Sequence, residues 1–467
     1  MTLPKLTATL GSSRDPANHR DCASESAKYN TIGTQAGPIA AVAVVFVALA
    51  IRFFNIVDHY AVDIFFGDHW AFEDSTLFHE HSWLEIFRWQ YGPHRQGLGG
   101  LLLAIAEPLL HWNQRCISFG IALIIACACL AALCLKHRIF GRFGYSDVII
   151  PLLFFTPVQY EILLGANNPS HGPLPLMLVV LYCLAWTIDH NLWRYGTVLL
   201  LNVLLIYTGF GLFMGLITPA LFGLKYFHNR ERKALISLVL AVLSLGSFFI
   251  GYRNDPAVEC FSPYLHGHLH YFVFIAFMFS TFVKMYPAQS TVIPAFLTGS
   301  ILVTVAAVST TSYIPKLVRE RTSSLKLLEP FLLLSYSLIF CCAAAYGRTC
   351  ESVVPGPRYM IYLIPAFFGL YLAALSEAAP VLRREYVGVV LLVSLLSSAW
   401  ISANELRTMS TISRQRRGWK DCYVASHSIG ACDAVSRVSI YATPEPPDLH
   451  SKLDFLEKRH LSLFSVH

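Results

Sequence analysis

Carboxylate side chains are concentrated in one segment near the start of the chain. Residues 57–100 read VDHYAVDIFFGDHWAFEDSTLFHEHSWLEIFRWQYGPHRQGLGG, with seven acidic residues and two arginines among many aromatic side chains. A carboxylate that apolar neighbours hold near a membrane surface could accept a proton from a sugar hydroxyl or coordinate a metal. The simpler alternative is a solvated acidic loop whose aromatic side chains anchor it at the interface.

The elements that must position this segment are long apolar stretches. Of the 467 residues, 55% are hydrophobic and 14% are charged, whereas about 25% of the residues in an ordinary soluble domain are charged. A membrane span needs roughly 20 apolar residues, and residues 37–57 form the first such run. Further candidate spans are centred near residues 125, 156, 180, 203, 217, 243, 300, 337, 367 and 395. We therefore predict an all-α, polytopic transmembrane helical bundle with about 11 spans.

The orientation of the spans follows from the charge of the loops, because short cytoplasmic loops retain Lys and Arg. The basic loops are residues 136–142, residues 228–233, residues 316–326 and the pair Arg383 and Arg384. One alternation of spans places all of these on the cytoplasmic side, together with residues 1–35. It requires that the apolar stretches 97–112 and 271–284 lie along or dip into the outer interface without crossing the membrane.

This alternation divides the chain into three parts. Residues 1–35 form a cytoplasmic N-terminal segment, residues 36–404 form the transmembrane domain, and residues 405–467 form a small outer tail. The acidic first outer loop covers residues 58–114. Its aromatic and charged pattern predicts helices that lie at the membrane interface.

The tail carries features that the charge rule alone does not explain. Arg414, Arg416 and Arg417 are typical of a cytoplasmic segment, although long terminal segments determine topology less strongly than short loops do. On the outer side, Cys422 and Cys432 could form a disulfide, or they could remain free thiols. The competing disulfide partners are Cys260 and Cys350.

Several short motifs resemble a known superfamily of membrane enzymes. The acidic loop after the first span is followed by QYGPHRQ at residues 90–96, and later come a basic turn at residues 135–142, a polar outer turn at residues 165–172, and Gly-Pro-Arg-Tyr at residues 356–359. In this order the motifs resemble the GT-C superfamily of polyprenyl-phosphate-sugar-dependent glycosyltransferases. The resemblance covers most of residues 36–404, and its motifs are short and permissive.

The resemblance implies a catalytic carboxylate in the first outer loop. The family's catalytic acid would fall on Asp63, Asp68 or Asp74, and we favour Asp68. Asp68 lies in Gly-Asp-His-Trp, where the glycine permits a turn and the two ring side chains can frame a sugar. Asp63 could instead be an interface residue, and Asp74 could cap a following helix.

The resemblance also implies cations that hold the phosphate of a lipid-linked donor. In an inverting transfer, the carboxylate activates the acceptor hydroxyl while fixed donors stabilise the departing phosphate. Arg348 and Arg358 are the best candidate phosphate ligands, and snorkelling to the lipid headgroups is the alternative role for both. The remaining candidate substrate-binding residues are His94, Arg95, His171 and Tyr359.

The polar turn after the third span departs from the family pattern, which has a second acidic element there. This chain has Asn167, Asn168 and His171 at that place, and Glu161 precedes them inside the span. Because hard cations prefer several carboxylate oxygens, a divalent metal is not favoured, and we expect neither a metal site nor a tightly bound cofactor. The histidines at 79, 81, 266, 268 and 270 could suggest a transition metal, but alternate histidines on exposed loops are usually incidental.

These observations lead to one preferred function and two alternatives. The preferred function is transfer of a sugar from a polyprenyl-phosphate donor to a glycan, lipid or protein acceptor on the outer face. The alternatives are a multi-span transporter or flippase of a lipid-linked or polar substrate, and a non-catalytic membrane assembly factor. The expected partners are membrane lipids and these substrates, and no nucleic acid is expected. We expect a multi-pass protein of the bacterial inner membrane, because N-glycosylation acceptor sequences are scarce in the outer loops.

Overall fold

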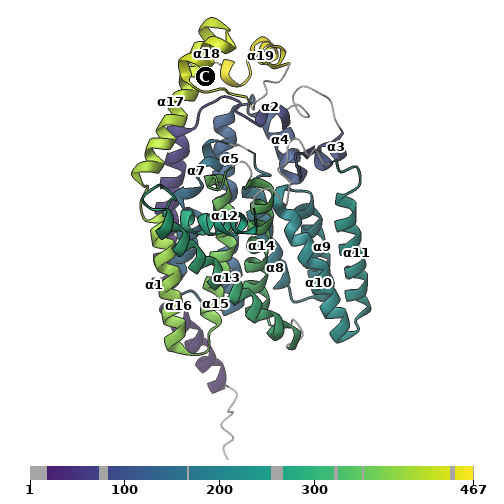
Figure 1. Ribbon diagram of the computed structural model, residues 1–467. Coiled ribbons are helices and arrows are strands. Elements are labelled where there is room, and N and C mark those ends of the chain that lie inside the picture. The colour runs from purple at the N-terminus through teal and green to yellow at the C-terminus, as the bar shows by residue number, and fades with distance from the viewer. Residues whose placement is uncertain are drawn as a thin grey trace, which may run out of the picture.

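A computed structural model gives the fold of the chain and describes residues 18–72, 82–165, 168–253, 267–319, 324–349, 352–441 and 448–465. Helices make up 79% of the structure and strands 2%, and most of the helices run side by side as one bundle (Figure 1). The prediction of a helical membrane protein is therefore confirmed. Its core holds interlocked aromatic and aliphatic side chains along the bundle axis.

Eight helical segments among the described residues are long and apolar enough to cross a bilayer. They are residues 35–60 of α1 (Asn18–Tyr60), α5 (Gln114–Phe140), Tyr145–Leu164, Gly209–Asn229, α13 (Val292–Arg319), α14 (Leu325–Arg348), Pro357–Ser376 and Pro380–Ser426. The predicted count of about 11 spans is not confirmed. The other candidates are shorter helices, with 14 residues in α8 (Pro173–Trp186), 16 in α9 (Asn191–Ile206) and 17 in α11 (Arg232–Phe248).

Several of the long segments are interrupted helices. Tyr145–Leu164 contains a 3-10 turn (Tyr145–Val148), α6 (Ile149–Phe154), a second 3-10 turn (Pro157–Gln159) and α7 (Tyr160–Leu164). The break falls at Pro157 because proline has no N–H to continue the hydrogen-bond ladder, and the Thr156 side chain accepts the N–H of Val158 instead. In the same way, a 3-10 turn at Gly209–Gly211 precedes α10 (Leu212–Asn229), and a 3-10 turn at Pro357–Leu363 precedes α15 (Ile364–Ser376).

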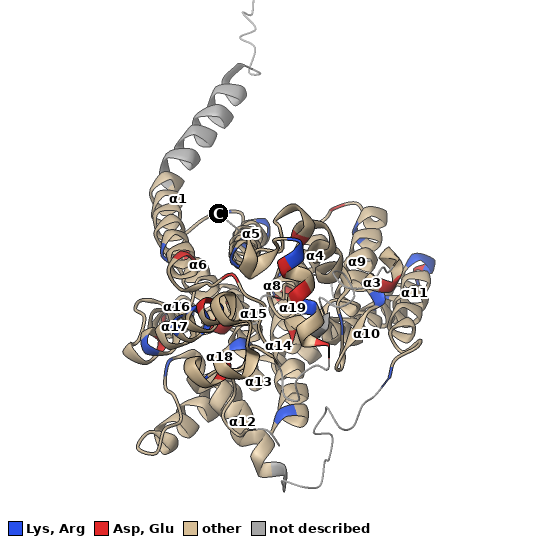
Figure 2. Cartoon of the chain, turned by 90° about the horizontal axis from the view of Figure 1, so that it is seen from above, with Lys and Arg blue, Asp and Glu red and all other residues tan. Residues whose placement is uncertain are grey.

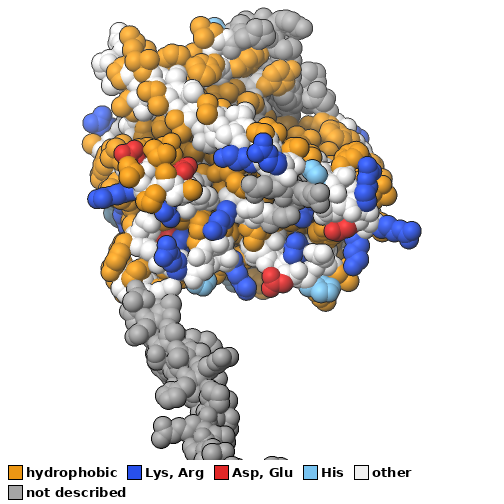
Figure 3. Space-filling view, turned by 90° about the horizontal axis from the view of Figure 1, so that it is seen from below, with side chains coloured by type: hydrophobic (Ala, Val, Ile, Leu, Met, Phe, Trp, Pro, Cys, Tyr) orange, Lys and Arg blue, Asp and Glu red, His pale blue; other side chains and the backbone are white. Residues whose placement is uncertain are grey.

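The predicted basic loops gather at one end of the bundle. The described N-terminal part of α1, the ends of α5, α10, α13 and α15, and the start of α16 (Pro380–Ser398) all lie at this end (Figure 1). Lysine and arginine side chains are spread over this face and outnumber the acidic ones (Figure 3). The opposite end holds α2 (His69–Phe72), α3 (Trp83–Arg88), α18 (Ile429–Ser436) and α19 (Leu449–Lys458) (Figure 1). We call these the inner and outer ends.

The two apolar stretches that were expected to lie at the outer interface form short helices. α4 (Gly97–Leu109) has 13 residues and α12 (Gly267–Phe282) has 16, so that at 1.5 Å per residue neither reaches the roughly 30 Å of the hydrocarbon core. α12 also runs across the bundle and not along it (Figure 1). The helices α8 and α9 are equally short, and α12 packs into the core through Phe274, Met278 and Phe279, so the surface placement of the two stretches stays a prediction.

The C-terminal residues form a small helical cap over the first outer loop. This C-terminal cap comprises α17 (Ala403–Ser426), which continues upward from α16, together with α18 and α19. Trp419, Leu453 and Leu456 of the cap pack with Trp70 and Trp112 of the loop in a separate hydrophobic cluster. Cys422 and Cys432 form a disulfide within the cap, with their Cα atoms 5.5 Å apart, so the structure favours this pairing over free thiols.

The placement of the basic loops predicts the side on which each end of the bundle lies. A reporter enzyme that is active only outside the cytoplasm should be active when fused after residue 465, and it should be inactive when fused after Arg230. Activity of the two fusions is the measurement, with an immunoblot to show that both are made. Activity of the fusion after Arg230 alone would show that the bundle has the opposite orientation in the membrane.

Candidate functional site

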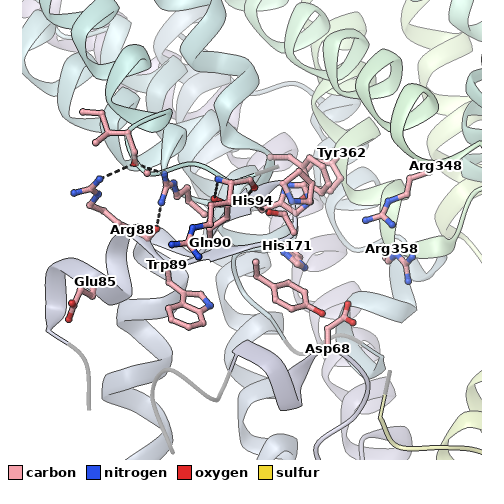
Figure 4. A pocket seen from close by; sticks show the side chains of 18 of the residues that line it. Asp68, Glu85, Arg88, Trp89, Gln90, His94, His171, Arg348, Arg358 and Tyr362 are labelled. Carbon is pink, nitrogen blue, oxygen red and sulfur yellow. Dashed lines mark hydrogen bonds between the residues drawn. The ribbon is translucent and has the colours of Figure 1, made fainter. Parts of the chain in front are cut away.

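One large cavity lies at the outer end of the bundle, among the part of the chain that the structure describes. Its volume is about 1210 Å³. The first outer loop supplies much of its wall, and the outer ends of several spans supply the rest (Figure 4). Its lining residues are Asp68, Leu84, Glu85, Arg88, Trp89, Gln90, Tyr91, Gly92, Pro93, His94, Arg95, Ile162, His171, Phe210, Ile250, Gly251, Arg253, Arg348, Arg358, Tyr359 and Tyr362.

Most of the site residues that the sequence predicted line this cavity, although they come from four separate parts of the chain. They are Asp68, His94, Arg95, His171, Arg348, Arg358 and Tyr359. Asp74 lies outside the described residues. Asp63 does not line the cavity. Arg348 and Arg358 project from one side of the cavity near Asp68, whereas Arg88 lies on the opposite side (Figure 4).

Asp63 is a structural residue that joins the loop to the end of the chain. Its side chain is buried and accepts the backbone N–H of Gln114 at 2.9 Å. The hydroxyls of Ser465 and Ser462 donate to the same carboxylate at 3.3 and 3.5 Å. A carboxylate held in this way is satisfied by neutral donors and is not directed into the cavity.

Asp68 is exposed at the cavity wall, and the C-terminal cap fixes its position. The preceding residue, Gly67, has φ +59°, a conformation that favours glycine. The N–H of Gly67 donates to the carbonyl of Ile440 at 2.7 Å, and Nε1 of Trp70 donates to the same carbonyl at 3.1 Å. These bonds on both sides of Asp68 set the direction of its carboxylate.

Tyr91 of the strand β1 (Gln90–Tyr91) is the immediate partner of Asp68. Its hydroxyl donates to the Asp68 carboxylate, and burial together with this negative charge raises the pKa of Tyr91. β1 pairs with β2 (His94–Arg95) as a short antiparallel hairpin, and Gly92 provides the positive φ of +53° that the tight turn needs. The hairpin therefore brings a phenol against the carboxylate that the sequence favoured.

The guanidinium of Arg358 lies in the cavity wall beside a second carboxylate. Nη1 of Arg358 donates to Oε1 of Glu161 at 3.1 Å, and the backbone N–H of Arg358 donates to Oε2 of Glu161 at 3.0 Å. The guanidinium also lies 5.2 Å from the centre of the Tyr359 ring. Glu161 thus orients Arg358, a role that the sequence did not reveal because the two residues are 197 positions apart.

His94 and His171 form the floor of the cavity with Phe210. The ring centre of His94 is 3.9 Å from that of Phe210 and 5.3 Å from that of His171. Burial lowers the pKa of His94, and the positive charge of Arg348 lowers it further. Burial also lowers the pKa of His171 to about 4, while Asp68 opposes this shift and Arg358 and Arg348 add to it. Both imidazoles are therefore neutral at pH 7.

Arg95 is a structural residue, although it borders the cavity. Its side chain is 4% exposed, and its guanidinium donates to the carbonyls of Arg88 at 2.5 Å, Phe248 at 2.7 Å and Ile250 at 3.0 Å. The carbonyls of Phe248 and Ile250 lie at the last residue of α11 and just beyond it, where no further helical turn supplies N–H donors. Arg95 therefore joins the hairpin to α11 and is not directed at a ligand.

The cavity combines features that suit a phosphorylated ligand with hydroxyl groups. Guanidinium groups bind phosphate oxygens by charge-assisted hydrogen bonds, and the half-buried ring of Trp89, which lines the cavity, can pack against a sugar ring. From the sequence, Arg253 counts only as one of the few outer-side cations, and Trp89 and Tyr91 are not selected as site residues, since aromatic and basic residues at an interface are usually anchors. Among the described residues, no group of three or more His, Cys, Asp or Glu side chains is placed to hold a metal ion.

Comparison with protein-family models, with curated proteins and with solved structures finds no match to this chain. The fold and the cavity define the class as a multi-span helical membrane protein with a cation-rich outer cavity.

The buried contacts of Arg95 predict a stability defect when its charge is removed. The Arg95→Met variant should lose about 2–3 kcal/mol of unfolding free energy, because the Phe248 carbonyl loses its side-chain donor and the Ile250 carbonyl keeps only Arg88 as a side-chain donor. Unfolding in detergent is the measurement. Arg253→Met serves as the control, because Arg253 lines the same cavity but is exposed, and an equal loss in both variants would contradict the assignment.

The lowered pKa of His171 predicts a dependence of stability on pH. Between pH 6.5 and 4 the unfolded chain binds a proton that the folded protein does not, so the folded state loses stability as the pH falls through this window. The unfolding temperature of the wild type should drop more between pH 7 and pH 5 than that of His171→Gln. His190→Gln, at an exposed site directly before α9, should behave as the wild type, and identical slopes for all three proteins would refute the prediction.

Proposed function

We propose that the protein is a membrane glycosyltransferase that takes a sugar from a polyprenyl-phosphate donor at the outer face of the membrane. The observation that carries this proposal is the convergence of Asp68, Arg348 and Arg358 on one outer cavity. A carboxylate that accepts a proton and guanidinium groups that hold a leaving phosphate are the two requirements of a direct displacement at a sugar carbon. The resemblance of the sequence motifs to the GT-C superfamily supports the same reaction.

Each side chain has a defined role in the proposed reaction. Asp68 takes the proton from the acceptor hydroxyl as that oxygen attacks the anomeric carbon, and the bond to the donor phosphate breaks. Arg348 and Arg358 bind the phosphate oxygens, whose negative charge grows in the transition state. Tyr91 donates to Asp68 and holds the carboxylate in place. His94 and His171, being neutral, can exchange hydrogen bonds with sugar hydroxyls without repelling Arg348.

An apolar rim beside the cavity supports a lipid-linked donor. Trp83 and Leu84 of α3 are 61% and 64% exposed, and Phe249 and Ile250 after α11 are 58% and 62% exposed. The two segments are joined, because the Arg88 guanidinium donates to the carbonyl of Ile250 at 3.0 Å. A polyprenyl chain could lie against this rim in the outer leaflet while its phosphate enters the cavity.

The acceptor, the number of membrane crossings and the location are proposed from the sequence. The acceptor is a glycan, lipid or protein with a free hydroxyl group, and the reaction uses no tightly bound cofactor. The chain crosses the membrane about 11 times, with α8, α9 and α11 as the shorter crossings, and it resides in a bacterial inner membrane.

A transporter or flippase of a lipid-linked substrate is the second candidate. The interrupted helices at Pro157–Gln159 and Gly209–Gly211 favour it, because transporters commonly bind substrates at broken helices. The breaks here stand next to the outer cavity, where Ile162 and Phe210 line the wall. An assembly factor without catalysis would keep the fold and bind the same lipid.

The test is sugar transfer by the purified protein in liposomes that contain radiolabelled polyprenyl-phosphate sugars. Asp68→Asn should lower the rate by at least about 100-fold, because general-base catalysis contributes about that much or more. Asp58→Asn is the matched control, since Asp58 is 66% exposed, pairs with Arg115 and does not line the cavity. Equal transfer by wild type and Asp68→Asn would remove Asp68 from the mechanism. Movement of the lipid across the bilayer without transfer would favour the flippase.

A further inference from the structure

Two arginines of the C-terminal cap have no role in the proposed reaction. Arg414 and Arg417 are exposed on α17 at the outer end of the protein, where the distribution of basic residues in membrane proteins makes arginine uncommon. Their neighbour Arg416 is explained by packing, because its side chain is 5% exposed, donates to the carbonyl of Leu164 and stacks 3.7 Å over the ring of Phe66. The positions of Arg414 and Arg417 need another cause.

The two arginines line a shallow groove between α17 and the end of α1. The groove has a volume of about 400 Å³, and its walls are His59, Tyr60, Ser410, Ser413, Arg414, Arg417, Gly418 and Asp421. One nitrogen of Arg417 donates to the carbonyl of His59 at 2.6 Å, which joins the two helices. Within the ranges that the structure describes, Arg414 makes no ion pair and no hydrogen bond through its guanidinium. The groove therefore holds two positive charges against the single carboxylate of Asp421.

The geometry of α1 places this groove at the level of the lipid headgroups. The spanning part of α1 has 26 residues, or about 39 Å at 1.5 Å per residue, which exceeds the roughly 30 Å of hydrocarbon. Its apolar sequence ends at Val57, and the next residue, Asp58, has a side chain that is 66% exposed. His59 and Tyr60 consequently lie just above the hydrocarbon boundary.

The groove also faces the lipid and not the interior of the bundle. α1, α16 and α17 lie at one margin of the molecule both from the side and from above (Figures 1 and 2). Below the groove, Trp400 between α16 and α17 is 45% exposed, as is usual for tryptophan at a membrane interface. A lipid of the outer leaflet can reach the groove from the side.

We propose that this groove binds the headgroup of an anionic phospholipid. The guanidinium groups of Arg414 and Arg417 hold the phosphate, since arginine binds phosphate oxygens with charge-assisted hydrogen bonds. The Ser410 hydroxyl adds a donor, and Asp421 accepts from a hydroxyl of the headgroup. The acyl chains then descend along the exposed face of α1, where Val44, Val47 and Ile51 are 67%, 52% and 57% exposed. This site shares no lining residue with the outer cavity, and the proposal does not depend on the proposed transferase activity.

The test is retention of phosphatidylglycerol by the full chain in detergent, measured by native mass spectrometry and compared with phosphatidylcholine. Arg414→Gln combined with Arg417→Gln should weaken phosphatidylglycerol binding about 25-fold, at about fivefold for each arginine near a membrane surface, and should leave phosphatidylcholine unchanged. Arg414→Lys combined with Arg417→Lys keeps both charges and should retain most of the binding.

Matched controls separate a specific site from general attraction and from misfolding. Arg407→Gln removes an exposed arginine of the same helix outside the groove, and it should bind phosphatidylglycerol as the wild type does. All variants should unfold within a few degrees of the wild type. Wild-type binding by the double glutamine variant, or an equal loss in Arg407→Gln, would overturn the proposal. Displacement of the lipid by an equal concentration of inorganic phosphate would overturn it in favour of a free-anion site.

Discussion

Helices that end within or near a membrane leave carbonyl groups that must find donors, because hydrocarbon offers none. This chain interrupts its helices repeatedly, and basic side chains from distant segments supply the missing donors. Arg95 binds carbonyls at and just beyond the end of α11, Arg416 binds the carbonyl of Leu164 at the end of α7, and Arg52 donates to the carbonyls of Phe155 and Ser398 at the ends of α6 and α16. Each of these cations also lies at the C-terminal end of a helix, where the partial negative charge of the helix dipole attracts it. The short and broken helices of the bundle depend on these contacts.

The need of helix-end carbonyls for donors also divides the charged residues at the outer cavity into structural residues and residues that are available to a ligand. Arg95 is committed to the backbone, whereas Arg358 is oriented by Glu161 with part of its side chain exposed. The carboxylates also fall into these two groups. Asp63 is buried and accepts from neutral donors, whereas Asp68 is exposed at the cavity wall. A residue type at a suitable place in the sequence is therefore not enough to assign a ligand-binding role. The partners of each charge decide between a structural and a chemical role.

The sequence predicted the membrane class and the gathering of basic loops at one end, because hydropathy and loop charge depend on local composition. It also selected residues such as His94, His171 and Arg358 that the fold brings to one cavity. It could not predict that Glu161 meets Arg358 or that Tyr91 meets Asp68, because those contacts depend on packing between distant segments. The number of spans was equally hard to fix, since α8, α9 and α11 are apolar but shorter than a full crossing. The length of each helix depends on where the packed structure interrupts it.

The contact between Trp70 and Ile440 has a consequence for the order in which the molecule is made. The two residues are 370 positions apart, so a ribosome that adds 5–20 residues each second needs roughly 20–70 s to pass from one to the other. During that interval the segment around Asp68 has already left the ribosome, while its anchoring carbonyl does not yet exist. The last helices must then pack over the loop. Completion of the outer cavity is therefore a late event in biogenesis, after the spans have been inserted.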